Sequence, residues 1–242
     1  MVSSALAMSY AEKQSRAVFK RSTLMGFLAS GEVWTTLSVT AELLQTTERN
    51  ALRLLQTLVK EKLIKVDEGI VEHSNLKLYG ISDHGIAVTE SANPGCRAFQ
   101  IGKTNPSYVQ HHVQGQILRI RGEQAGWTDF MPGKLLLVDN ASRLKKLPDG
   151  LCTRSDSRRC AWEIERYVKS PKRLTDVLSA HLQQIVGKHY DYVYYFVPDV
   201  AAQQRAFAKV EFVVVDGNKI KLNETHRARF KVCDIKGWQG EA

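Results

Sequence analysis

The order of helical and extended segments in the second half of the chain limits its fold more than any other feature. A long helical pattern covers 107–124, and an amphipathic helical pattern covers 171–188. Between them lie three apolar stretches typical of strands, at 134–139, 147–153 and 160–165. The β-prone sequence YVYYFV follows at 192–197. This order predicts a three-strand meander, followed by a helical crossover to a parallel strand. The fold class is therefore mixed α/β.

Three weaker patterns complete the second half. A short helix is expected around 201–208, a buried central strand at 210–215 and an edge strand at 230–233. Breaker-rich sequence at 93–106 is a plausible linker in front of this domain, which we predict to cover 107–242.

The first half predicts a winged helix-turn-helix domain over 16–92, after a flexible terminus at 1–15. Three helices are expected, the first from Ala17 to a stop at Gly31, the second at 37–44 and the third at 48–62. Short strands at 63–66 and 76–81 flank a polar loop at 67–75. Ser82-Asp83-His84-Gly85 then begins another helix, an ending common in winged helices.

The third helix carries a polar and basic face, separate from its apolar one. The candidate DNA-binding residues are Thr47, Arg49, Asn50, Arg53, Gln56, Thr57 and Lys60 on or next to this helix, with Lys65 and Lys77 on the strands. A solvated basic face on a plain helical subdomain is the alternative. Winged helices also dimerise or bind protein, so a homodimer stays open.

The chain is strongly basic. It has 34 Lys and Arg against 25 Asp and Glu, a formal charge of +9, which favours polyanions and above all nucleic acid. No apolar run approaches a membrane span, and no signal-peptide pattern is present. The four cysteines show no C-x-x-C spacing and are expected to be reduced thiols. These features indicate a cytoplasmic protein.

Three acids mark the candidate site. Asp149 lies at the end of a short apolar segment, and Glu163 and Glu165 lie on one face of the next strand. If the two strands pair, the carboxylates converge, and a divalent cation would offset their repulsion. Each acid taken alone fits a turn residue or a solvated strand face equally well.

Pro148-Asp149 and Glu163-Ile164-Glu165, in this strand order, resemble the PD-(D/E)xK signature of the restriction-endonuclease-like αβββαβ fold. Glu165 replaces the lysine of that signature. With the winged helix, the His111-His112 pair and the downstream Lys169-Ser170, the chain resembles the replication-relaxation family and its MobC-type plasmid mobilisation relaxases.

The resemblance implies metal-dependent nicking of one strand at a plasmid transfer origin, in the bacterial cytoplasm, with accessory mobilisation and coupling proteins as partners. Asp149 and Glu163 would be the ligands of Mg²⁺ or Mn²⁺, and the carbonyl of Ile164 is a candidate third ligand. Glu165 would be another ligand or a base. Lys169 or Lys172 would restore the missing positive charge.

Several alternatives stay open. Metal-activated water is the default nucleophile, with Tyr167 and Tyr190 as tyrosine candidates, and His111 or His112 is a candidate acid–base group. No two of the seven histidines are separated by one residue, which disfavours the His-hydrophobic-His relaxase class. Because Glu165 stands at the lysine position, the second hypothesis is a non-catalytic DNA-binding replication or transfer regulator on a degenerate nuclease fold.

Overall fold

The computed structural model describes residues 9–69, 76–140 and 146–241, and for 137–140 it describes the backbone alone. The chain divides into two compact units, Met1–Val109 and Gln110–Ala242, which we call the N-terminal and C-terminal units. Both combine helices and strands, so the predicted mixed α/β class is confirmed at that level. Within the described residues, no helix is both long and apolar enough to cross a bilayer.

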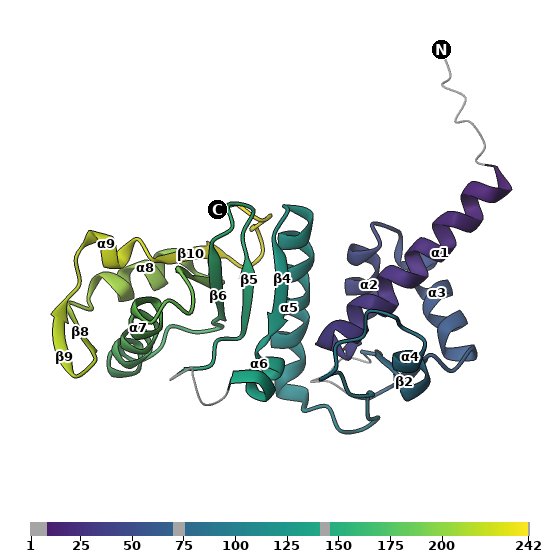
Figure 1. Ribbon diagram of the computed structural model, residues 1–242, viewed down its shortest axis with the longest axis horizontal. Coiled ribbons are helices and arrows are strands. Elements are labelled where there is room, and N and C mark those ends of the chain that lie inside the picture. Colours follow the sequence, from purple (N-terminus) through teal and green to yellow (C-terminus); the bar gives the residue numbers. More distant parts are fainter. Residues whose placement is uncertain (1–8, 70–75, 141–145, 242) are drawn as a thin grey trace, which may run out of the picture. The chain divides into compact units, whose positions relative to one another are not determined.

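The N-terminal unit packs helices against a small sheet (Figure 1). Its helical elements are α1 (Tyr10–Phe27), a π-helical turn η1 (Leu28–Glu32), α2 (Leu37–Leu43), α3 (Glu48–Lys60) and α4 (Asp83–Ala87). Its strands are β1 (Trp34–Thr35), β2 (Ile64–Asp67) and β3 (Leu78–Ile81), in the antiparallel order β1-β3-β2. Apolar residues from α1, α3 and the sheet, such as Leu24, Leu55 and Ile81, form one buried core.

Local signals fix most of these boundaries. Thr47 caps α3 by accepting a hydrogen bond from the N–H of Asn50 at 3.4 Å, as its position in the sequence predicts. Gly31 breaks the helical backbone inside η1, directly after α1, with φ 118°, a value that only glycine adopts readily. That helix begins at Tyr10, earlier than predicted, because Ser9 and Glu12 form a capping box. Residues 10–15, expected to fray, are therefore helical.

The two-residue strand β1 is absent from the sequence prediction, because a segment this short carries no period. It pairs with β3, with Trp34 opposite Gly80. The loop expected at 67–75 lies outside the described residues from 70 to 75.

The C-terminal unit is built on a five-stranded sheet in the order β10-β7-β6-β5-β4 (Figure 1). The strands are β4 (Thr128–Pro132), β5 (Gly150–Thr153), β6 (Arg159–Ile164), β7 (Tyr192–Val197) and β10 (Phe230–Asp234). β4, β5 and β6 form an antiparallel meander, and β6, β7 and β10 are parallel. A three-strand meander, the crossover to YVYYFV and the edge strand near 230 are therefore present, but the first strand of the meander is not the predicted one.

Helices cover both faces of this sheet. The helices of the C-terminal unit are α5 (Pro106–Gln124, whose residues from Gln110 onward belong to this unit), α6 (Gly133–Asn140), α7 (Pro171–Val186), α8 (Val200–Ala208) and α9 (Glu224–Arg227). Alternate strand residues face opposite sides, so Tyr194 and Trp162 pack with Leu118 of α5, whereas Tyr195 packs with Leu178 of α7. The strand β6 is thus buried on both faces, which is why its residues from 160 to 164 are buried.

Two predicted strands were wrong. Residues 134–139 lie in helix α6, and the first strand of the meander is β4, which was not predicted. A short continuous apolar run fits a buried helix as well as a buried strand, because it has no period to separate them. Residues 210–215 do not form a central strand. β8 (Phe212–Val215) pairs with β9 (Asn218–Lys221) in a separate two-stranded hairpin, and its burial alternates.

All four cysteines are free thiols, as expected. Cys152 and Cys160 lie opposite each other on β5 and β6, both buried.

Candidate functional site

Asp149 and Glu163 lie opposite each other at one end of the paired strands β5 and β6. Gly150 pairs with Trp162, and the Asp149 N–H donates to the carbonyl of Trp162 at 3.0 Å. The N–H of Ile164, two residues further along β6, donates to Oδ2 of Asp149 at 2.8 Å. The strand pairing on which the predicted acidic site depended is therefore present.

Asp149 is held by a histidine. Nε2 of His111, on α5, lies 3.2 Å from Oδ2 of Asp149. Burial raises the pKa of the Asp149 carboxyl, but His111, the Ile164 N–H and the charge of Lys146 outweigh burial and hold this pKa below its ordinary value. Asp149 is accordingly a carboxylate at neutral pH. His112, the residue after His111, contacts Gln116 instead, with 3.1 Å between Nε2 of His112 and Nε2 of Gln116.

Glu163 is almost completely buried, at 3% exposure, and it has two basic neighbours. Lys146 binds its Oε1 directly. Nε2 of His181, on α7, lies 3.2 Å from the same oxygen without the alignment of a hydrogen bond. Nδ1 of His181 is 2.6 Å from the hydroxyl of Tyr190. Lys146, Glu163, His181 and Tyr190 thus form a chain of polar contacts that is buried except at Lys146.

Burial sets the protonation of this chain. It lowers the pKa of His181, and the carboxylate of Glu163 offsets only part of that effect. Burial likewise raises the pKa of the Tyr190 hydroxyl, which stays neutral. Tyr190 is therefore a neutral hydrogen-bond partner of His181 in this structure.

Glu165 is bound to a lysine four residues further along the chain, Lys169. Burial lowers the pKa of Lys169, and the charges of Glu163 and Asp149 raise it again in part. The charges of Glu163 and Asp149 therefore both act on Lys169. By contrast Lys172 is exposed at the start of α7, and Tyr167 is 78% exposed. The structure gives neither of these two a contact with the acids.

Sequence reasoning missed four residues around Glu163, namely Lys146, His181, Gln184 and Tyr195. Gln184 donates to the carbonyl of Lys146 at 2.8 Å, and Tyr195 is the residue opposite Glu163 on β7. The Oε1 of Gln184 and the hydroxyl of Tyr195 are buried with no hydrogen-bond partner among the described residues. The burial of His181 could have been predicted from the sequence, because it follows Leu174 and Leu178 at helical spacing on the apolar face of α7.

A divalent cation needs several donor atoms around one point. In the described part of the chain, no group of three or more His, Cys, Asp and Glu side chains is placed to hold a metal ion. Among these residues, however, the contacts of Asp149 all reach Oδ2 and those of Glu163 all reach Oε1. One oxygen of each carboxylate is left over, and hard oxygen donors of this kind suit Mg²⁺ or Mn²⁺.

The candidate DNA-binding residues on α3 lie on its exposed side. Arg49, Asn50, Arg53, Gln56, Thr57 and Lys60 are all exposed, as is the cap residue Thr47. The two strand lysines are engaged within the unit. Lys65 donates to the carbonyl of Phe99 at 3.4 Å, and Lys77 binds Glu68. Among the candidate residues, those on α3 are therefore exposed, whereas the two strand lysines already contact other groups.

Comparisons with family models, with curated proteins and with solved structures give no match to this chain.

Proposed function

We propose that the protein binds duplex DNA through α3 and nicks one strand with the carboxylates of the C-terminal unit, as a plasmid mobilisation relaxase does at a transfer origin. One observation carries this proposal. Asp149, directly before β5, is hydrogen-bonded to Trp162 and Ile164, the two neighbours of Glu163 on β6, and the charges of Lys146 and Lys169 act on these acids. Paired acids with a nearby cation suit phosphodiester cleavage, where charge develops on phosphate oxygens.

DNA binding is supported by the arrangement of the N-terminal unit. α2 and α3 are followed by the strands β2 and β3, and β3 also pairs with β1, an order consistent with a winged helix. In such a domain the second helix of the pair enters the major groove, so Arg49, Asn50 and Arg53 would reach bases or phosphates.

Each residue of the site has a definable task. His111 holds the Asp149 carboxylate in place, and the N–H of Ile164 fixes the same oxygen. Lys146 or Lys169 would contact the scissile phosphate, and this would supply the charge that Glu165 does not. A divalent cation, held by the remaining oxygens of Asp149 and Glu163, would supply an activated water and neutralise charge on the phosphate.

The test is conversion of supercoiled plasmid to open circle, with and without a candidate transfer origin, in the presence of Mg²⁺ or Mn²⁺. Asp149→Asn and Glu163→Gln should each abolish nicking while DNA binding, measured by fluorescence anisotropy, is retained. Asp176→Asn, which changes an exposed acid on α7, is the matched control and should nick normally. Undiminished nicking by both site variants would exclude this site.

A second function is favoured by a separate observation. Each of the three acids already contacts a basic side chain: His111 for Asp149, Lys146 for Glu163 and Lys169 for Glu165. The two lysines offset the charges of Glu163 and Glu165 without a metal ion, which fits a non-catalytic DNA-binding regulator. Thermal shift with Mn²⁺ separates the two functions, because a ligand that binds the native state raises its stability. A rise that is lost in Glu163→Gln favours the nuclease, and no rise favours the regulator.

A further inference from the structure

Three basic side chains surround the ring of Tyr192 at the start of β7. The guanidinium carbons of Arg154 and Arg229 lie 5.5 Å and 5.4 Å from the ring centroid, and Nζ of Lys231 lies 5.6 Å from it. We call these four residues the Tyr192 cluster. None of them belongs to the acidic site or to α3.

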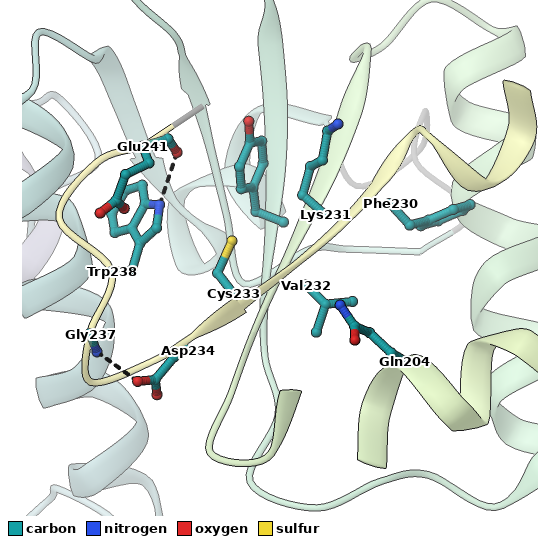
Figure 2. Close-up of a pocket in the computed structure, with 10 residues that line it drawn as sticks. Gln204, Phe230, Lys231, Val232, Cys233, Asp234, Gly237, Trp238 and Glu241 are labelled. Atoms are coloured by element: carbon teal, nitrogen blue, oxygen red, sulfur yellow. Dashed lines mark hydrogen bonds between the residues drawn. The ribbon is translucent and has the colours of Figure 1, made fainter. Parts of the chain in front are cut away.

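Strand pairing brings the Tyr192 cluster together from distant parts of the chain. Arg154 follows the end of β5, and Arg229 directly precedes β10, where Phe230 pairs with Val193. Arg229 and Lys231 are two residues apart and so project to the same side of β10. Figure 2 shows Lys231 on the side of β10 that also carries Cys233, with Val232 on the other side beside Gln204.

The cluster keeps its positive charge. A cation over an aromatic ring gains about 0.5–1 kcal/mol at an exposed site, while two unit charges 4 Å apart in water repel by about 1 kcal/mol. The ring therefore helps to hold the cations together without neutralising them. Arg154 pairs with Asp156 at 3.1 Å. In the described part of the chain, neither Arg229 nor Lys231 has a carboxylate within 4.0 Å.

Adjoining residues extend this surface. The segments 154–159, 191–192 and 229–231 contain five basic residues and only two acids, Asp156 and Asp191. Asp191 pairs with Arg158 at 3.6 Å, and the N–H of Arg159 donates to Asp191 at 3.2 Å. Arg159 begins β6 and Glu163 lies near its end. At about 3.3 Å per residue the surface is about 13 Å from Glu163 along the strand, outside direct contact with the acids.

These groups match one class of ligand. Guanidinium and ammonium groups placed together bind phosphate oxygens, with two donors per guanidinium. A membrane surface would also need apolar side chains to insert. The exposed large apolar side chains of the described residues, such as Phe212 and Tyr167, all lie outside these three segments.

We infer that the Tyr192 cluster is a second nucleic-acid contact, on the C-terminal unit, which takes the phosphate backbone of a DNA strand. This contact depends neither on nicking by the acids nor on duplex recognition by α3. A chain that is basic overall would then hold DNA at two separately formed surfaces.

The experiment measures binding of the full chain to a fluorescein-labelled single-stranded oligonucleotide by anisotropy, at a series of NaCl concentrations. The test variant is Arg229→Gln with Lys231→Gln. The control variant is Lys221→Gln with Lys236→Gln, which removes the same charge from exposed positions of the same unit. A third variant, Arg229→Lys with Lys231→Arg, keeps the charge of the cluster.

Loss of two phosphate contacts should make the slope of log K against log salt shallower by about 1.4, and should weaken binding about 25-fold at 0.1 M salt. The control and the charge-conserving variants should stay close to the wild type. The cluster substitutions are also made in a background that carries Arg49→Gln and Arg53→Gln on α3. In that background they should weaken oligonucleotide binding by the same factor as in the wild type. That arm separates a failure of this inference from a failure of DNA binding by α3.

Three results would overturn the inference. The test and control variants could lose affinity equally, which would assign the effect to net charge. The charge-conserving variant could lose as much as the test variant, which would assign it to structure. The cluster substitutions could abolish binding of pyrophosphate, or of anionic lipid vesicles, while leaving oligonucleotide binding unchanged, which would make the cluster a small-anion or membrane site.

Discussion

The contact between Lys146 and Glu163 gives the most direct test of the site. Lys146→Met keeps the aliphatic stem and removes the charge, so Glu163 stays buried without its closest cation. Breaking a buried ion pair from one side costs about 3–5 kcal/mol. The side chain of Glu163 is 5% exposed but that of Lys146 is 20% exposed, and His181 stays within 3.2 Å of the carboxylate. We therefore expect a loss of about 2–4 kcal/mol from the C-terminal unit.

The assay is urea unfolding, monitored by tryptophan fluorescence. Three of the four tryptophans, Trp127, Trp162 and Trp238, lie in the C-terminal unit, so a Trp34→Phe background makes the signal specific to that unit. With a slope of about 2 kcal/mol per molar urea, the midpoint should fall by about 1–2 M. The matched control is Lys172→Met at an exposed position, which should change stability by less than about 0.5 kcal/mol.

A double-mutant cycle makes the reasoning refutable. If the loss comes from an uncompensated carboxylate, Lys146→Met should cost less than about 1 kcal/mol in a Glu163→Gln background. An equal cost in both backgrounds would show that the stem of Lys146, and not its charge, supports the fold. A cost in the wild-type background no larger than that of the Lys172 control would show that the ion pair contributes nothing.

Two further predictions follow from burial and from close packing. Burial holds the pKa of His181 below its ordinary value, so the unfolded state binds the proton more tightly, and the C-terminal unit should lose stability as the pH falls below about 6.5, by at most about 1.4 kcal/mol per pH unit. In the Trp34→Phe background, His181→Gln should be less stable at pH 7 yet show a shallower decline on acidification, and an unchanged pH profile would contradict this reasoning. Gly85→Ala should cost the N-terminal unit about 1–3 kcal/mol, because the new Cβ would lie 2.2 Å from the carbonyl oxygen of Leu63. Gly115→Ala is also in a helix, but its new Cβ would lie 3.5 Å from Ile164, so it should be stabilising by about 0.5–1 kcal/mol. Hydrogen exchange in β2 and β3 measures the effect of Gly85→Ala, and urea unfolding measures that of Gly115→Ala. Equal effects of the two substitutions on stability would refute the packing argument.

Patterns that are local in the sequence predicted their elements well. The helix α3 follows from its cap at Thr47 and from its apolar period, and β7 coincides with the run at 192–197. The juxtaposition of Asp149 with β6 also followed from the strand order. Caps, periods and element order depend on nearby residues, so they can be read without the tertiary structure.

The surroundings of the acids depend on the tertiary structure. Whether 134–139 forms a helix or a strand was decided by packing, because an apolar run is compatible with both. The contacts of Glu163 with Lys146 and with His181 join residues 17 and 18 positions away, and those of Tyr192 with Arg229 and Lys231 span longer separations still.

The sequence by itself thus determined most of the elements and their order, and it brought Asp149 next to the strand that carries Glu163. Only the tertiary structure decided which positive charge each acid contacts. The physical reason is that the charge state of a buried group depends on every side chain within a few ångströms of it, and the folded sheet gathers those side chains from segments that share no local pattern.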